Sequence, residues 1–74
     1  MPKYPVLKSS EIIKILINLG FKEIRQKGSH KQFKHPDGRI TTVPVHRGRD
    51  ISPILLKQIL KEINVELNNI INYL

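Results

Sequence analysis

The residue with the clearest capacity for chemistry is His30, which follows Gly28 and Ser29 and precedes Lys31 and Lys34. Histidine has an ordinary pKa of about 6.5, so its side chain donates and accepts protons near neutrality. Cations beside it can hold a phosphate. An imidazole next to an RNA phosphodiester can act as a general base without a metal, because the ribose 2′-hydroxyl supplies the nucleophile. A Gly-Ser-His tripeptide is a weak signal alone, so the elements that position this histidine decide its meaning.

Length and composition predict one small intracellular domain. The chain has 74 residues and no cysteine, which excludes disulfides and cysteine-based zinc sites. No apolar run approaches the roughly 18 residues of a membrane span, and the N-terminal residues lack the apolar centre of a signal peptide. We therefore expect a single domain over residues 1–74, located in the cytoplasm and without a membrane partner.

Positive charge is concentrated in the middle of the chain. The net charge is +7, and residues 21–50 hold eight Lys or Arg against Glu23, Asp37 and Asp50, a balance of +5. Residues 1–20 balance to +2 and residues 51–74 to zero. A basic surface of this kind favours a polyanion partner, nucleic acid first. The alternative is that the charge only keeps the protein soluble.

The first regular element is a helix that Ser9 or Ser10 caps and Gly20 ends. Glu11 complements the positive helix start. Apolar residues wrap most of the surface of this helix, so it should touch a sheet and a second helix together. Residues 1–8 are expected to be irregular, since Pro2 and Pro5 oppose regular structure.

From residue 21 the pattern changes to strands and turns. We expect strands over residues 21–27, 30–35 and 39–45, joined by Gly28-Ser29 and Pro36-Asp37-Gly38 into an antiparallel meander.

Alternation along the second strand decides where His30 points. It turns Phe33 toward the helices and places His30, Gln32 and Lys34 on the opposite, solvated face. A bulge at Gly28 would reverse this assignment.

The last third of the chain predicts two more helices after a basic loop over residues 45–50. Ser52 caps the first of them, Pro53 takes its first position and Asn64 ends it. A short C-terminal helix over residues 65–74 is rich in asparagine and needs to dock on the core. The predicted fold class is α+β: α-β-β-β-α with a three-stranded antiparallel sheet, both main helices on one face, and a short C-terminal helix. The core should include Ile12, Leu16, Phe33, Leu56, Ile59 and Leu60.

This ordered set of features resembles the HicA family of toxins, which cleave messenger RNA in bacterial and archaeal toxin–antitoxin systems. The resemblance covers roughly residues 6–63. It rests on Leu19-Gly20-Phe21, Gly28-Ser29-His30, Val43-Pro44-Val45-His46 and the Ser52-Pro53 helix start. The family implies a fold similar to double-stranded-RNA-binding domains and a histidine on the second strand that RNA cleavage requires. The matching residue here is His30.

The resemblance implies the toxin of a type II toxin–antitoxin system, a metal-independent mRNA endoribonuclease that a HicB-type antitoxin inhibits. His30 is the predicted catalytic general acid/base. The candidate RNA-binding residues are Lys27, Ser29, Lys31, Lys34, His46, Arg47 and Arg49. No cofactor is expected. A zinc site built from His30, His35 and His46 is disfavoured, because His30 and His35 have opposite parity on one strand.

Two other classes of function stay open from the sequence. A non-catalytic double-stranded-RNA-binding module would share the fold and would not need His30. A structural adaptor that binds only protein would leave the central charge unexplained. A base-stacking platform for single strands is poorly supported, since the chain has few aromatic residues and no Trp.

Overall fold

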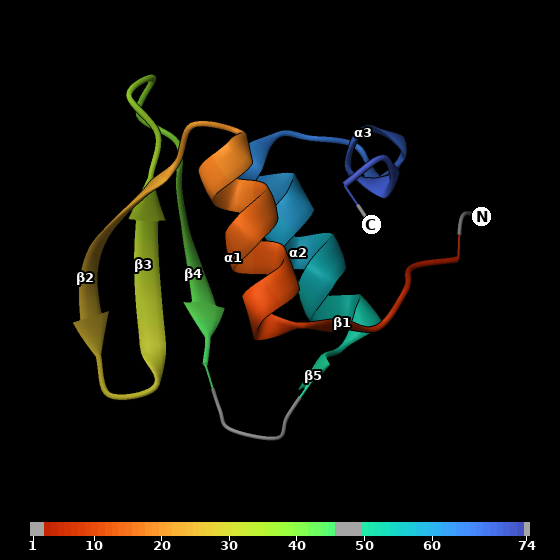
Figure 1. The fold of residues 1–74 in the computed structure, drawn as a ribbon, viewed down its shortest axis with the longest axis horizontal. Helices are drawn as coiled ribbons and strands as arrows, with labels where there is room; N and C mark the ends of the chain where they lie inside the picture. Colours follow the sequence, from red (N-terminus) through yellow and green to blue (C-terminus); the bar gives the residue numbers. More distant parts are fainter. Residues whose placement is uncertain (1–2, 46–49, 74) are drawn as a thin grey trace.

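The computed structural model describes residues 3–45 and 50–73. In chain order its elements are β1 (Leu7–Lys8), α1 (Ser9–Asn18), β2 (Lys22–Lys27), β3 (His30–Lys34), β4 (Ile40–Pro44), β5 (Asp50–Ile51), α2 (Pro53–Ile63) and α3 (Leu67–Ile71). Strands β2, β3 and β4 form an antiparallel sheet in that order, and α1 and α2 cover one face of it (Figure 1). The predicted α+β class and the α-β-β-β-α order are confirmed.

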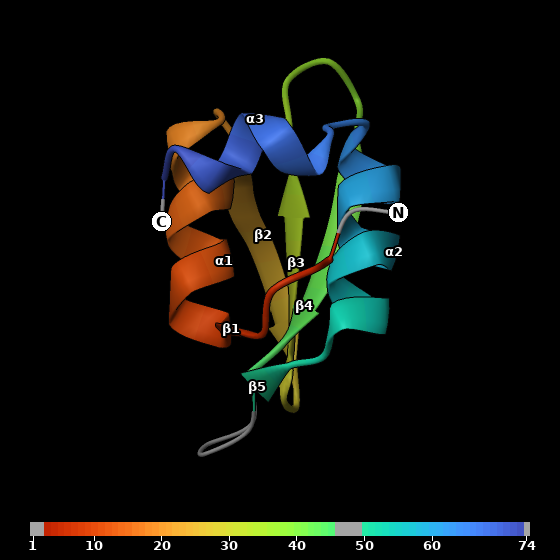
Figure 2. The same cartoon turned by 90° about the vertical axis from the view of Figure 1, so that its right-hand side faces the viewer.

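The other face of the sheet has no described helix or strand over it. Figure 2 shows the sheet behind α1 and α2, with α3 crossing those helices on the side away from the sheet. The described part of the molecule is thus layered as sheet, paired helices and terminal helix. No helix among the described residues is both long and apolar enough to cross a membrane.

The prediction that Ser9 or Ser10 caps α1 is wrong. Lys8 occupies the cap position in an extended conformation, and its N–H donates to Glu11 Oε1 at 2.9 Å. Ser9 is already helical, and its hydroxyl donates to the carbonyl of Pro44 at 2.7 Å. This bond fastens the start of α1 to the end of β4.

The lead-in to α1 is also more regular than predicted. Leu7 and Lys8 pair antiparallel with Ile51 and Asp50, so residues 7–8 are strand β1 rather than irregular. A strand of two residues is too short to show an alternating pattern in the sequence. The pairing forms because Leu7 and Ile51 are both buried in the core. The extended path up to Lys8 is why the helix begins at Ser9.

Gly20 ends α1 as the sequence predicts. Its φ of +98° lies in the left-handed region that glycine adopts without strain. The N–H groups of Gly20 and Phe21 donate to the carbonyls of Ile17 and Leu16, at 3.0 and 2.9 Å. These two bonds satisfy carbonyls that the helix leaves free and turn the chain into β2.

The limits of α2 are also confirmed. Ser52 Oγ accepts the N–H of Leu55 at 3.1 Å, and Pro53 takes the first helical position. Asn64 ends the helix with a φ of 56°, and the N–H of Val65 returns to the carbonyl of Leu60 at 3.0 Å.

The core lies between the sheet and the helices and includes all six residues predicted for it. Its sheet side consists of Phe33 from β3 with Thr41 and Val43 from β4. The terminal helix contributes Leu67 and Ile70 to the same cluster. Ile71, also on α3, is half exposed, and Leu74 lies outside the described residues.

Two isoleucines of α2 provide a matched test of this packing. Ile59 has no exposed surface, whereas Ile54 is 82% exposed. Ile59→Val should lower the free energy of unfolding by about 1 kcal/mol, because it removes a buried methylene and leaves a small cavity. Ile54→Val should change it by less than about 0.5 kcal/mol. Urea denaturation measures both, and equal losses would contradict the placement of α2.

Candidate functional site

The candidate site is the face of the sheet turned away from the helices, referred to below as the open face. Cross-strand register arranges it in three rows: Lys27, His30 and Pro44; then Arg25, Gln32 and Thr42; then Lys22, Lys34 and Ile40. All of these residues have the parity opposite to that of buried Phe33. The prediction that His30, Gln32 and Lys34 share the solvated face is therefore confirmed.

His30 lies at one end of this face, as the first residue of the central strand, and it is exposed. A shallow hollow of about 270 Å³ surrounds it, lined also by Arg25, Lys27, Gln32 and Thr42. Residues from all three strands therefore meet around the imidazole. A hollow of this shape is open to solvent and can receive part of a polymer.

Hydrogen bonds from residues on both neighbouring strand ends hold the turn before His30. Gly28 has a φ of +58°, a conformation that suits glycine at the first position of a two-residue hairpin connection. The Nε2 of Gln26 donates to the Gly28 carbonyl at 3.0 Å, and the N–H of Val45 donates to the Ser29 carbonyl at 2.6 Å. His30 consequently starts β3 at a fixed position between its partners on β2 and β4.

The irregularity of β2 lies at Ile24 and not at Gly28. The register passes from Glu23 opposite Phe33 to Arg25 opposite Gln32, so Ile24 is the extra residue of a bulge. Because the bulge is in β2, the alternation of β3 is undisturbed. The bulge also returns Lys22 to the face that holds Arg25.

Positive charge on the open face is uncompensated within the described residues. It carries Lys22, Arg25, Lys27 and Lys34, and none of these forms an ion pair with a carboxylate in residues 3–45 or 50–73. The acidic residue of β2, Glu23, lies on the other face of the strand and pairs with Lys31 at 3.3 Å. Among the described residues, the charged side chains of the open face are therefore all cations, and the ion pair of Glu23 with Lys31 lies on the opposite face.

The structure brings some predicted RNA-binding residues together and leaves others apart. Lys27 and Lys34 share the face of His30, and Ser29 lies in the adjacent turn. Lys31 lies on the opposite face with Glu23. His46, Arg47 and Arg49 lie outside the described residues.

Sequence reasoning missed Arg25 and Lys22 as members of this face. Arg25 had a readable signal, because the two-residue turn pairs Lys27 with His30 and alternation then places Arg25 beside it. Lys22 had none, because the bulge at Ile24 changes the phase of β2 before that residue.

His35 has a structural environment. Its ring packs edge-on against Phe21 with centroids 5.0 Å apart, and its Nδ1 accepts the N–H of Asp37 at 3.1 Å. A Cβ added to Gly20 would meet His35 Nε2 at 3.0 Å. His35 thus fills the space beside the end of α1, away from His30. Among the described residues, no group of three His, Cys, Asp or Glu could hold a metal ion.

Asp37 and Arg39 hold the turn after β3. Burial acts to raise the pKa of Asp37, but hydrogen bonds from the Arg39 backbone and guanidinium, together with the charges of Arg39 and His35, hold that pKa below its ordinary value. Arg39 also lies over the Phe21 ring, 5.1 Å from its centroid, and donates to the carbonyl of Ile63 at the end of α2. Asp37, like Glu23, is therefore paired with a cation, and it lies beyond the end of β3 opposite to His30.

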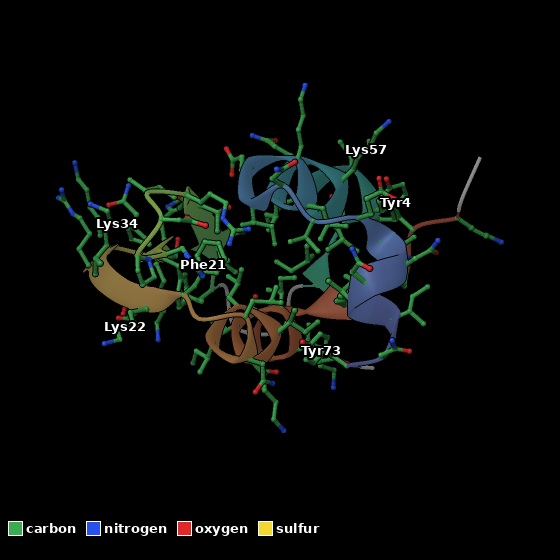
Figure 3. All side chains as sticks on the ribbon, turned by 90° about the horizontal axis from the view of Figure 1, so that it is seen from above. Tyr4, Phe21, Lys22, Lys34, Lys57 and Tyr73 are labelled. Atoms are coloured by element: carbon green, nitrogen blue, oxygen red, sulfur yellow. The ribbon has the colours of Figure 1, made fainter. Side chains whose placement is uncertain are left out.

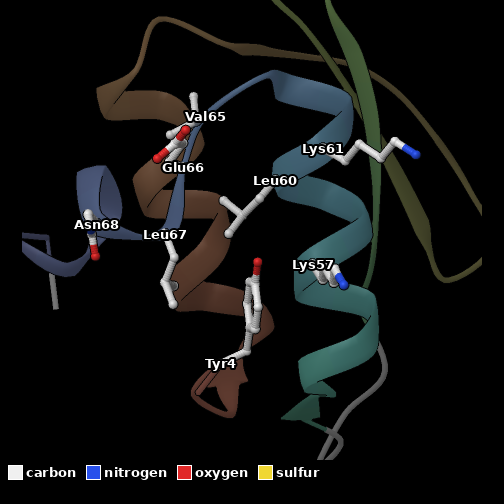
Figure 4. A pocket seen from close by; sticks show the side chains of 8 residues that line it. All are labelled: Tyr4, Lys57, Leu60, Lys61, Val65, Glu66, Leu67 and Asn68. Atoms are coloured by element: carbon white, nitrogen blue, oxygen red, sulfur yellow. The ribbon is translucent and has the colours of Figure 1, made fainter. Parts of the chain in front are cut away.

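A larger hollow lies on the helical side of the molecule. It has a volume of about 540 Å³. Figure 4 shows it between Tyr4, α2 and the segment leading into α3. Its walls are mainly apolar, with Lys57 and Lys61 on α2, and no histidine lines it. Figure 3 shows Lys34 at the sheet, on the far side of the molecule from Tyr4. The open face is therefore the better candidate for acid–base chemistry.

The chain matches one family model, described as the HicA toxin of bacterial toxin-antitoxin, over residues 9–65. This range covers α1, the whole sheet with His30, and α2. A search of curated proteins finds no match to the chain.

The contact between Gly20 and His35 generates a stability prediction. Gly20→Ala and Gly38→Ala both force alanine to a positive φ, near +98° and +101°, which should cost about 1–2 kcal/mol each. Only the residue 20 variant also meets His35, so it should be the less stable of the two. In a His35→Ala background the two losses should become equal, since the contact is gone. Thermal unfolding of the variants measures this, and an unchanged difference would mean that His35 does not pack there.

Proposed function

Because the chain belongs to the HicA toxin family, we propose that it is the mRNA endoribonuclease of a type II toxin–antitoxin system, acting in the cytoplasm with His30 as the general acid/base. The observation that carries this proposal is the exposed imidazole within an uncompensated basic face. A proton-transfer group and a set of phosphate-binding groups are what cleavage of RNA requires from a protein.

In the proposed reaction, His30 removes the proton from a ribose 2′-hydroxyl. The freed oxygen attacks the adjacent phosphorus, the bond from phosphorus to the 5′-oxygen breaks, and a 2′,3′-cyclic phosphate forms. Solvent protonates the departing oxygen, and His30 returns its proton to solvent, which its exposure permits. RNA supplies the nucleophile, so the reaction requires neither a protein nucleophile nor a metal.

The two cations of the open face nearest to His30 stabilise the charge that grows on the reacting phosphate. Lys27 lies directly opposite His30, and Arg25 lies one row further along β2. Because the hollow is open to water, each cation contributes less than it would in a closed pocket. Several cations acting together compensate for this, and Arg can bind two phosphate oxygens at once.

A non-catalytic double-stranded-RNA-binding module is the second candidate. It is compatible with the fold and with the basic face, since such modules bind phosphates and RNA shape. A binding module of this kind has no need for His30, which the hydrogen-bonded turn before β3 holds between Lys27 and Pro44. The nuclease accounts for both the charge and the imidazole, and we therefore favour it.

Replacement of the histidine tests the mechanism. His30→Ala should reduce RNA cleavage by about 10²–10⁴-fold, the usual contribution of a general acid or base. It should leave the thermal midpoint and most of the RNA affinity unchanged, because His30 is exposed. Cleavage of RNA by purified wild-type and variant protein, with and without EDTA, is the measurement. Lys57→Ala on α2 is the control variant.

EDTA should have no effect on the wild-type rate. Loss of cleavage in EDTA that zinc or magnesium restores would overturn the general-base mechanism. RNA binding with no cleavage by the wild-type protein would favour the binding module.

The exposed site also calls for an external inhibitor, which we propose is a HicB-type antitoxin with an acidic surface. Such a surface would cover the open face, and complementary charge would speed its association. Co-expression with the neighbouring gene product should yield a complex that cleaves RNA much more slowly than the free toxin. Its association rate should fall as salt rises. Full cleavage by a saturated complex would refute inhibition by occlusion.

A further inference from the structure

The end of the open face opposite to His30 contains a pair of like charges. Lys22 and Lys34 are direct register partners on β2 and β3, and both are exposed. Like charges directly opposite each other on neighbouring strands destabilise a sheet. Among residues 3–45 and 50–73, no carboxylate forms an ion pair with either lysine.

The contrast with Lys31 shows that this sheet can balance its charges. Lys31, on the other face, pairs with Glu23 on β2. An acidic residue at position 22 or 34 would create a similar pair on the open face. The sequence instead keeps two exposed lysines, which leaves their combined charge available to bind an anion.

We infer that Lys22 and Lys34 form a second phosphate site, and that a single RNA strand lies along β3 from this site to His30. This inference rests on the proposed function, and it adds the path of the substrate. The reacting phosphate lies at the row of His30. A phosphate further along the same strand lies between the two lysines.

The spacing of the rows supports this path. Lys34 lies four residue steps beyond His30 along β3, which corresponds to about 14 Å at 3.4 Å per residue. Arg25 lies in the row between, so cations recur at every row. Neighbouring rows are two residues apart along β3, or about 7 Å. Successive phosphates of a stretched nucleic acid strand recur at an interval similar to this row spacing. Each row can therefore hold one phosphate.

The width of the face favours one strand over a duplex. Three strands at about 4.8 Å spacing make a surface about 10 Å wide between the outer strand axes. A single strand fits along this surface, whereas an RNA double helix is wider. Gln32 and Thr42 in the middle row offer hydrogen-bonding groups between the two phosphate positions, and Ile40 offers an apolar contact beside Lys34.

The second site predicts that cleavage depends on substrate length. A dinucleoside monophosphate places its only phosphate at His30 and cannot reach the lysines. A longer single-stranded oligoribonucleotide reaches both positions. The double variant Lys22→Ala/Lys34→Ala should therefore reduce kcat/KM for the oligoribonucleotide about tenfold and leave that for the dinucleoside unchanged.

A second measurement is the salt dependence of RNA affinity, determined with the inactive His30→Ala protein. Removing the two lysines should lower the slope of log affinity against log salt by about 2. Lys57→Ala/Lys61→Ala makes the same charge change on α2, and it should alter neither the slope nor the length dependence. The stability of the Lys22/Lys34 variant should not fall, since a repulsive pair is removed.

The outcomes separate this inference from the proposed function. Wild-type protein that cleaves neither substrate would overturn the proposed function. Wild-type protein that cleaves the oligoribonucleotide, together with a Lys22/Lys34 variant that matches it on that substrate, would overturn the second phosphate site alone. An equal loss on both substrates would also overturn it, because the lysines would then act at the reacting phosphate. Better cleavage of an RNA duplex than of the single strand would overturn the proposed path.

Discussion

The pleat of β3 is the constraint on which both the core and the site depend. Successive side chains of a strand point to opposite faces, so burying Phe33 turns His30, Gln32 and Lys34 the other way. A slip of one residue would place a histidine and two further polar side chains under the helices and expose the phenylalanine. Because β3 is the central strand, pairing on both sides holds its register. The stability of the core therefore also fixes the position of the imidazole.

Helices α1 and α2 cover only one face of this sheet, and the two faces differ in how their charged residues are paired. On the covered side, Glu23 is paired with Lys31, and Asp37 is paired with Arg39 in the turn after β3. On the open side, water and salt screen the repulsion among Lys22, Arg25, Lys27 and Lys34, which makes their proximity tolerable. A buried arrangement of the same four cations would be too costly. The charge that stays unpaired within residues 3–45 and 50–73 is thus possible because no described helix or strand covers this face.

Features with a local cause could be predicted from the sequence, and features with a non-local cause could not. Gly20 and the Ser52-Pro53 helix start each act within one turn of chain, and Phe33 reveals the alternation of its own strand. The pairing of β1 with β5 joins segments far apart in the sequence through two residues each, and it displaced the expected serine cap. The bulge at Ile24 has no signal in composition and hid Lys22 from the site. The roles predicted for His46, Arg47 and Arg49 stay predictions, since these residues lie outside the described part of the chain.

On the proposed function, the same uncompensated charge serves binding and inhibition. The described residues form a shallow, open hollow that does not enclose a substrate. RNA is therefore held mainly by contacts between cations and phosphates, which carry little sequence information. Selectivity then has to come from the few groups that can reach bases or sugars, such as Gln32 and Thr42 in the middle row. An acidic protein surface that binds the open face would displace RNA by occupying these cations, and it would need no specific contact with His30. The feature that makes the face a nuclease site is therefore also the feature through which a partner can inhibit it.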